Sequence, residues 1–461
     1  MENKLKTGLL NNIFRVLSTN FWVAIVGFAS SFIFPKILTV DNYALYHTFT
    51  LYLTYITILH LGFPSGMVIN YAGKDYEQIE RSQYKSEIII ITAILSFFTV
   101  IFIAFSVAFK SRMLSYIALA IIPCDLISLY KALLQTWSKF KQYSILSTIL
   151  ATSIPTVAVL FYLLVGELPG DIYILIYLAI NWIIAIYLFV EIGRKIRSVK
   201  AAPILTAKNW STEKTGIAIV LGNYINTLFV SADKQFVKWF FDNSSFAYYS
   251  FGMSMQALMT VFITSIAQPL FPAMAQGRFE DKEYNNIKEL LMLFGSLSGL
   301  AYFATAIIVK HFIPHYVESL DVVGIYFVVF PAMAVVNCLY INLYKIKNRM
   351  KQYVWTLAGI LMIAILLNST AIYFYHHFTA VAIATTVTYY IWFFLGIRQF
   401  EFLKLSFGDI VYLLIYSIGF FMITHHFDGF VGMFVYLVFI IVITFLFYRN
   451  NLKILAKYVK K

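Results

Sequence analysis

Long apolar runs separated by short polar segments make up most of the chain. A run of about 20 apolar residues is enough to cross a hydrocarbon core of about 30 Å as a helix. Such runs lie at residues 13–34, 44–66, 87–109, 113–135, 144–166, 171–192, 215–239, 246–272, 287–310, 321–344, 353–375, 378–398, 408–425 and 429–448. The pattern predicts an all-α integral membrane protein with about 14 membrane-spanning helices.

The polar segments between these runs differ in charge. Basic residues accumulate on the cytoplasmic side of membrane proteins. If the N-terminus is inside, the outer segments hold only Lys36, Lys110, Arg112, Lys234, Lys238 and Lys310 of the 35 Lys and Arg residues. The pattern therefore predicts that both termini are cytoplasmic. The net charge of +13 is then explained by the basic cytoplasmic segments. We therefore do not interpret it as a nucleic-acid-binding surface, and we expect no nucleic-acid partner.

Composition and loop length exclude several classes of protein. The chain is 61% hydrophobic and 12% charged, whereas a soluble domain carries about 25% charged residues. The loops are too short to hold a soluble catalytic or nucleotide-binding domain, and no Walker A, HExxH or CxxC pattern occurs. Cys124 and Cys338 both lie inside apolar runs. We expect a secondary-type transporter, not an enzyme, and no cofactor or metal.

Three short motifs occur twice, in the same order. They are Asp41–Tyr46 (DNYALY) with Asp242–Tyr249 (DNSSFAYY), Phe63–Pro64 with Phe271–Pro272, and Pro123 before Lys141–Tyr143 (KQY) with Pro331 before Lys351–Tyr353 (KQY). Each half contains six predicted helices. Because six is an even number, the two halves should run in the same direction and be related by an axis along the membrane normal. The pattern predicts an N-lobe at 1–192, a basic cytoplasmic linker at 193–214, a C-lobe at 215–400, and two additional helices with a basic cytoplasmic tail at 401–461.

Three segments carry a family resemblance: Phe34–Tyr43, Leu61–Gly66, and Asp233–Lys234 leading into Phe246–Ser250. With the helix layout of residues 1–400, they resemble the polysaccharide-transporter branch of the multidrug/oligosaccharidyl-lipid/polysaccharide exporter superfamily, and most of all the Wzx-type flippases of O-antigen and capsule repeat units.

The resemblance implies a fold and a function. The fold is a V-shaped pair of six-helix lobes in the bacterial inner membrane. The function is to move undecaprenyl-diphosphate-linked oligosaccharides from the inner to the outer leaflet by alternating access. Membrane lipids, a coupling proton or sodium ion, and polysaccharide polymerase and chain-length proteins are candidate partners, in the O-antigen, lipopolysaccharide or capsule pathway.

Asp125 is the candidate for ion coupling. It lies about 18 Å from the outer end of its predicted helix, close to the membrane midplane, and shares a face with Ser128 and Gln135. An ionisable residue at this depth is costly unless it faces protein or water. Pro123 frees backbone carbonyls nearby. A static hydrogen bond between helices explains the residue equally well.

Further polar residues in the predicted spans are candidate ligands for the diphosphate-sugar head group. They are Arg15 and Thr19 in the first span, Lys131 beside the Asp125 face, and Asn223, Asn226 and Lys234 in the seventh. The planar guanidinium of Arg15 suits a diphosphate, although a cytoplasmic anchor would also be basic. Depth along the helix places Asp233 and Lys234 near the outer rim, where a lysine also extends to the interface.

Tyr46, Tyr55, Tyr224 and Tyr249 are candidates for stacking on sugars, but membrane-interface belts and helix packing use tyrosines in the same way. Two other functions remain open. A multidrug or small-molecule exporter is expected to carry more acidic residues within the membrane than this chain does. A membrane glycan polymerase, which is an enzyme, is expected to carry paired carboxylates in an outward loop.

Overall fold

The computed structural model describes residues 2–72, 74, 76–203, 207–277 and 279–459. These residues form helices and connecting turns, with no β-strand in the described ranges. The chain divides into two compact units, residues 1–228 and 229–461. The division falls inside α8 (Ala207–Phe240), so a single helix contributes to both units. Each unit is described below by itself.

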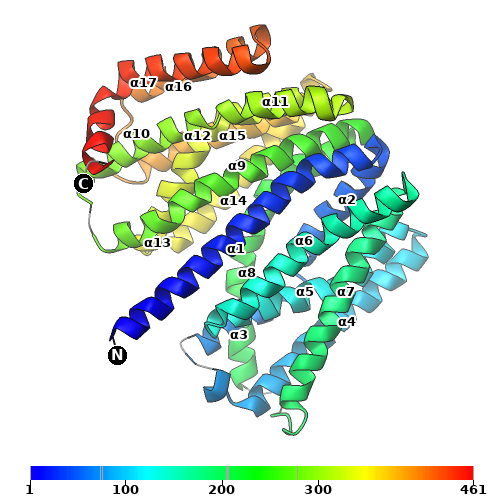
Figure 1. Ribbon diagram of the computed structural model, residues 1–461. Helices are drawn as coiled ribbons and strands as arrows, with labels where there is room; N and C mark the ends of the chain where they lie inside the picture. Colours follow the sequence, from blue (N-terminus) through cyan, green and yellow to red (C-terminus); the bar gives the residue numbers. More distant parts are fainter. Residues whose placement is uncertain (1, 73, 75, 204–206, 278, 460–461) are drawn as a thin grey trace. The chain divides into compact units, whose positions relative to one another are not determined.

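Unit 1 is built around α5 (Arg112–Thr136). Its other helices are α1 (Glu2–Ile37), α2 (Val40–Ile56), α3 (Phe63–Tyr71), α4 (Arg81–Ala108), α6 (Phe140–Val165), α7 (Gly170–Ile196), the first part of α8, and a short 3₁₀ turn at Tyr76–Gln78 (Figure 1). α5 packs against α2, α3, α4, α6 and α7. It is 67% buried across its apolar span, whereas α6 is 6% buried, so α5 is the core of this unit.

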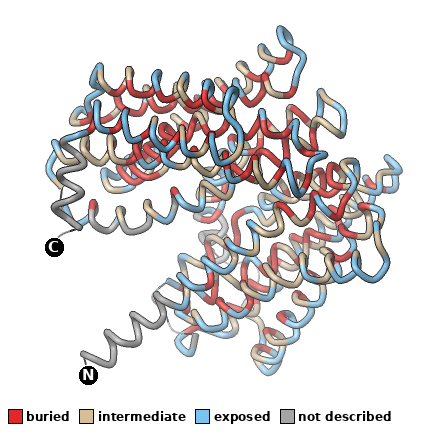
Figure 2. The backbone as a smooth tube through the Cα atoms, turned by 45° about the horizontal axis from the view of Figure 1, so that its top comes forward, coloured by how far each residue is buried: buried red, intermediate tan, exposed pale blue. Residues whose placement is uncertain are grey.

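Unit 2 is built around α12 (Ser319–Val335), which continues through a π-helical turn (Val336–Tyr340) into α13 (Ile341–Ile346). Its other helices are α9 (Asn243–Ala275), α10 (Asp281–Leu297), α11 (Leu300–Phe312), α14 (Met350–Phe374), α15 (Phe378–Arg398), α16 (Phe407–His426) and α17 (Gly429–Val459), with a 3₁₀ turn at Pro314–Tyr316. α12 packs against α9, α10, α15 and α16, and the apolar span Ser319–Ile346 is 78% buried. Figure 2 colours buried positions red and exposed positions pale blue along the helices of both units.

The helices confirm a multi-pass membrane protein. Within the described residues, 12 helices are long and apolar enough to cross a membrane, and every one of the predicted segments overlaps a helix. The segments outside these 12 correspond to α2, which has 17 residues, and to α8. Large apolar side chains such as Leu163 and Leu164 are exposed on the outer helices. Such apolar side chains suit a lipid environment. The helices also satisfy their own backbone hydrogen bonds there.

The second predicted segment differs from the structure. One helix was expected over 44–66, but α2 ends at Ile56 and α3 begins at Phe63. Leu61 and Gly62 between them have positive φ angles of 50° and 82°, which a continuous α-helix cannot accommodate. Pro64 then occupies the first turn of α3, where its missing N–H costs nothing. The counterpart in unit 2, α9, is continuous.

Gly62 also makes a close backbone contact with α8. A Cβ atom on Gly62 would lie 2.3 Å from the carbonyl carbon of Gly216, and a Cβ atom on Gly216 would lie 2.0 Å from the Gly62 oxygen. Both distances are far below a van der Waals contact. The break between α2 and α3 therefore allows α8 to approach so closely that only glycine fits at either position.

The proline motif of the sequence repeat marks the central helix of each unit. Pro123 lies inside α5 and Pro331 inside α12. α5 and the continuous helix α12–α13 end in turns of the same kind. Ser138 follows the first helix and Asn348 follows the second, and their φ angles are 55° and 53°. Lys139 N donates to Leu134 O, and Arg349 N donates to Tyr344 O, each at 2.8 Å. This six-to-one bond is that of a Schellman C-cap.

The repeat copies differ in length between the proline and this turn. The second copy is two residues longer, and the π-helical turn Val336–Tyr340 lies within it. A π-bulge accommodates one additional residue in a helix, so it absorbs part of the difference. The shared turn shows that the two central helices end in the same way despite it.

The Asp-Asn motif begins the second helix of each repeat. In unit 1, Asn42 Nδ2 donates to Leu168 O (3.3 Å) and Gly170 N donates to Asn42 Oδ1 (2.9 Å), which ties α2 to the start of α7. In unit 2, Asp242 Oδ1 accepts from Ser245 N (2.8 Å) at the start of α9. The aromatic residues that follow, Tyr43 and Phe246, are both buried. The motif is therefore mainly architectural.

Candidate functional site

The carboxylate of Asp233 is the centre of a buried polar cluster in unit 2. Its side chain comes from α8 and is 3% exposed. Tyr326 OH on α12 donates to Asp233 Oδ2, and Thr385 Oγ1 on α15 donates to the same oxygen at 3.3 Å. Lys234 N donates to Oδ1 at 2.6 Å, and Tyr249 OH on α9 lies 2.7 Å from Tyr326 OH.

Depth along the helix predicted that Asp233 lies near the outer rim of the membrane, and this depth stays a prediction. The structure adds that residues from α8, α9, α12 and α15 enclose the carboxylate. The sequence gives only its position along α8 and no information about the helices around it. Hydroxyl and backbone donors satisfy both carboxylate oxygens, as a buried charge requires.

Lys234 and Lys238 extend along α8 to the ring of Phe246 on α9. Their Nζ atoms lie 5.6 and 5.1 Å from the ring centroid, within the range of a cation–π interaction. Lys238 Nζ also donates to Asn243 Oδ1 at 3.1 Å. In the turn between the helices, hydrogen bonds from Ser245 hold the pKa of Asp242 below its ordinary value. These contacts fix the helical hairpin α8–α9.

Asp125 contrasts with Asp233. It is 3% exposed on α5, in the core of unit 1, and its Oδ2 atom has no hydrogen-bond partner among the described residues. Its predicted neighbours Ser128 and Gln135 are exposed, so the face on which all three were expected to lie is divided between interior and surface. A buried carboxylate oxygen without a donor is costly unless a proton or a cation compensates its charge.

Arg15 and Thr19 lie on α1, and their environments differ. The Arg15 side chain is exposed. Thr19 is buried, and its hydroxyl donates to Arg15 O on the same helix at 2.9 Å. On the same helix, Trp22 Nε1 donates to Thr152 Oγ1 of α6 at 3.0 Å. Arg15 is therefore available for a ligand, whereas the Thr19 hydroxyl is already engaged.

Asn223 and Asn226 are exposed on α8, and Tyr224 between them is partly exposed. Lys131 on α5 is also partly exposed, and its Nζ atom lies 5.7 Å from the centre of the Tyr143 ring. All three polar residues can reach a ligand at the surface of unit 1. Binding by any of them stays a prediction.

The four tyrosines proposed for sugar stacking fall into two groups. Tyr46 is buried and stacks on Phe34 with ring centroids 5.1 Å apart. Tyr249 is fully buried in the Asp233 cluster. Tyr55 and Tyr224 are partly exposed. In this conformation only the second pair offers surface to a sugar. Sugar stacking by any of the four stays a prediction.

Three buried charged residues were missed by the sequence interpretation. Glu87 on α4 is fully buried; it accepts from Tyr71 OH, and from Gln83 Nε2 at 3.2 Å. Lys288 on α10 forms a 2.5 Å ion pair with Asp409 on α16, and their side chains are 1% and 0% exposed. All three lie at the beginning of predicted apolar runs, at residues 87, 287 and 408, where charges are ordinary. The pattern Ser406-x-x-Asp409 was a signal, since it forms a capping box at the start of α16.

No three His, Cys, Asp or Glu side chains of the described residues lie close enough together to hold a metal ion. The polar groups that could act on a ligand are therefore separate carboxylates, hydroxyls and cations, distributed over both units.

Comparison with known proteins places the fold. No family model matches the sequence, and no curated protein matches it either. Among solved structures, the chain is similar to one described as lipid II flippase MurJ in an inward closed conformation. The TM-score is 0.69 at 15% sequence identity, and the match covers 95% of this chain and 99% of that one. The chain therefore has the all-helical membrane fold that is seen in the lipid II flippase MurJ.

Proposed function

We propose that this chain is a flippase for undecaprenyl-diphosphate-linked oligosaccharides, which it moves from the inner to the outer leaflet of the bacterial inner membrane. The observation that carries the proposal is the fold match to a lipid-linked precursor flippase over almost the full length of both chains. The sequence resemblance to Wzx-type flippases supports an oligosaccharide substrate for the O-antigen or capsule pathway.

In this proposal the exposed polar groups bind the head group of the substrate. Arg15 binds the diphosphate, because a guanidinium forms paired hydrogen bonds with phosphate oxygens. Lys131, Lys234, Asn223 and Asn226 add cations and amides, and the partly exposed Tyr55 and Tyr224 offer ring faces. The lipid tail stays in the bilayer during transport. The two units move during an alternating-access cycle that needs no ATP hydrolysis by this chain.

Asp125 is the proposed coupling residue. Its Oδ2 atom is buried and unpartnered among the described residues, whereas hydroxyl and backbone donors already satisfy Asp233. A proton or a sodium ion would compensate the charge of Asp125 in one state of the cycle. This difference supports Asp125 over Asp233 for coupling.

The proposal is tested in a strain that lacks the gene. A membrane-impermeant lectin or oxidant applied to spheroplasts labels only oligosaccharides on the outer leaflet. We expect the lipid-linked oligosaccharide to accumulate unlabelled without this protein and to be labelled when it is restored. Normal labelling in its absence contradicts the proposal. Loss of chain length with normal labelling supports a polymerase instead.

Arg15→Ala tests the proposed diphosphate ligand. We expect a loss of at least tenfold in the initial rate of outer-leaflet labelling, because a charge-assisted bidentate contact is removed, with unchanged amounts of protein in the membrane. Arg81→Ala is the matched control, since Arg81 is exposed and also lies on the predicted cytoplasmic side. Equal rates for the two variants contradict the role of Arg15.

Lipid II is a second candidate substrate, favoured by the name of the structural neighbour. The two substrates share an undecaprenyl diphosphate and differ in the head group. Expression of this chain in cells depleted of their own lipid II flippase separates the two. Rescue of growth assigns lipid II, whereas failure to rescue together with restored oligosaccharide labelling assigns the glycan.

A further inference from the structure

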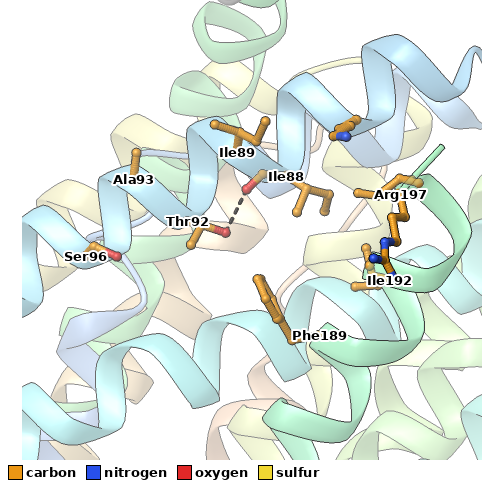
Figure 3. A pocket seen from close by; sticks show the side chains of 11 residues that line it. Ile88, Ile89, Thr92, Ala93, Ser96, Phe189, Ile192 and Arg197 are labelled. Carbon is orange, nitrogen blue, oxygen red and sulfur yellow. Dashed lines mark hydrogen bonds between the residues drawn. The ribbon is translucent and has the colours of Figure 1, made fainter. Parts of the chain in front are cut away.

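A cavity of about 620 Å³ lies between the beginning of α4 and the end of α7 in unit 1 (Figure 3). Its volume is typical of small-molecule sites. The walls are predominantly apolar, with Ile88 and Ile89 on α4 and Phe189 and Ile192 on α7. Phe189 extends from α7 toward α4 and is 51% exposed, so the cavity opens at the surface of the unit.

The wall offers few hydrogen-bonding groups along its length. Thr92 lies in the middle of the α4 side, and its hydroxyl donates to Ile88 O at 2.7 Å, which turns it toward its own helix. From Lys85 to Ser96 the α4 wall extends over about 16 Å at 1.5 Å per residue. Half of a hydrocarbon core of about 30 Å is about 15 Å. The cavity therefore matches the length of an acyl chain in one leaflet.

Two cations lie at one end of this apolar wall. Lys85 and Arg197 line the cavity, and none of the acidic residues that the structure describes does so. Lys85 Nζ donates to Val199 O at 2.8 Å, and an ammonium group has three donors, so two remain for a ligand. Ala202 N donates to Ser82 O at 3.1 Å, which folds residues 197–202 back onto α4 and holds Arg197 at this end.

The nearest acidic side chain on α7 is already neutralised. Glu191 forms an ion pair with Lys195 at 2.5 Å. The cationic end also belongs to the side that the charge pattern predicts to be cytoplasmic. Basic pockets between membrane helices on this side bind anionic lipid head groups.

We propose that this cavity binds one anionic glycerophospholipid of the cytoplasmic leaflet, with its phosphate on Lys85 and Arg197 and one acyl chain along Ile88, Ile89 and Phe189. The charge complementarity and the length of the apolar wall select this occupant. The proposal does not depend on the transport function, because binding is measured without transport.

Native mass spectrometry of the purified chain with phosphatidylglycerol tests the proposal. We expect one saturable molecule to bind, and phosphatidylcholine of the same acyl composition to bind at least tenfold more weakly. Lys85→Ala and Arg197→Ala should each weaken binding about fivefold, the usual contribution of one basic residue near an anionic lipid. Arg81→Ala, which removes an exposed cation outside the cavity, should leave it unchanged.

Gly193→Phe tests the apolar part separately. Gly193 lines the cavity, and a Cβ atom there would meet no atom within 4 Å, so a larger side chain can fill the space without disturbing the helix. We expect this variant to keep its melting temperature in lipid-free detergent and to lose phosphatidylglycerol binding. Unchanged binding overturns the proposal.

A competition experiment distinguishes a phospholipid from undecaprenyl phosphate as the occupant of the cavity. Undecaprenyl phosphate also combines a phosphate with an aliphatic chain. It should not displace phosphatidylglycerol at equal concentration. Displacement at an equal or lower concentration, or equal binding of phosphatidylcholine, overturns the assignment.

Discussion

Asp125 and Asp233 are both buried carboxylates, but their hydrogen-bond partners differ. The sequence separated the two residues only by their depth along a helix, because helical periodicity describes a residue's own helix and not the helices around it. The structure encloses Asp233 among Tyr326, Tyr249 and Thr385. It leaves Asp125 Oδ2 without a donor among the described residues.

Asp125→Asn should therefore preserve the fold and abolish the dependence of transport on an ion gradient. An amide removes the buried charge without a change of shape, so the melting temperature should stay the same or rise. Transport into vesicles with and without a proton or sodium gradient is the measurement.

Asp233→Ala is the comparison for this variant. It should lower the free energy of unfolding by about 1–3 kcal/mol, because the hydroxyl groups around it lose their acceptor. If Asp125→Asn keeps the full response to both gradients, coupling lies elsewhere.

At the scale of elements, the buried pair Lys288–Asp409 joins α10 to α16. Tyr448 OH on α17 donates to Asp409 Oδ1 at 3.1 Å, and Lys288 Nζ donates to Lys404 O at 2.5 Å. The sequence predicted α16 and α17 as two helices outside the repeat, but not how they attach. Attachment depends on pairing between residues more than 100 positions apart, which local patterns do not encode.

Asp409→Ala should lower the free energy of unfolding by about 3–5 kcal/mol, because it leaves the Lys288 charge buried without its partner. Lys288→Met combined with Asp409→Leu should recover part of this loss. Lys310→Ala is the control; its pair with Asp428 is exposed and should contribute less than about 1 kcal/mol. Equal melting temperatures for Asp409→Ala and Lys310→Ala would refute the larger contribution of the buried pair to stability.

The Gly62–Gly216 contact is a second feature of packing between elements. Gly216→Ala should destabilise unit 1 by about 1–3 kcal/mol or more, since the new methyl group overlaps backbone atoms that cannot move away. Gly27→Ala is the matched control. A Cβ atom there meets nothing within 4 Å, so the change should be neutral or slightly stabilising. Thermal unfolding in detergent compares them, and equal midpoints would contradict the close contact.

At the scale of the whole molecule, the sequence predicted most of the fold. Apolar runs located the helices, and Pro123 and Pro331 marked the central helix of each unit. The break at Leu61–Gly62 was missed, because Phe63–Pro64 has the same letters as Phe271–Pro272 inside the continuous α9. The orientation of the chain in the membrane is predicted from the distribution of charge alone, and it stays a prediction.

Single cysteines test that orientation in a chain whose Cys124 and Cys338 are replaced by alanine. Lys110→Cys lies in the exposed turn before α5, and Lys200→Cys lies in the exposed segment after α7. An impermeant maleimide should label Lys110→Cys in intact spheroplasts, but label Lys200→Cys only after permeabilisation. The reverse pattern would invert the topology.

The boundary between the units falls between Leu228 and Phe229, within an α8 that contains no proline among its 34 residues. Gly216 and Asp233 are separated by 17 residues, or about 26 Å of helix. One end of this rod is held at a glycine contact in unit 1 and the other in a polar cluster in unit 2. α8 is therefore one continuous helix with an anchoring contact in each unit.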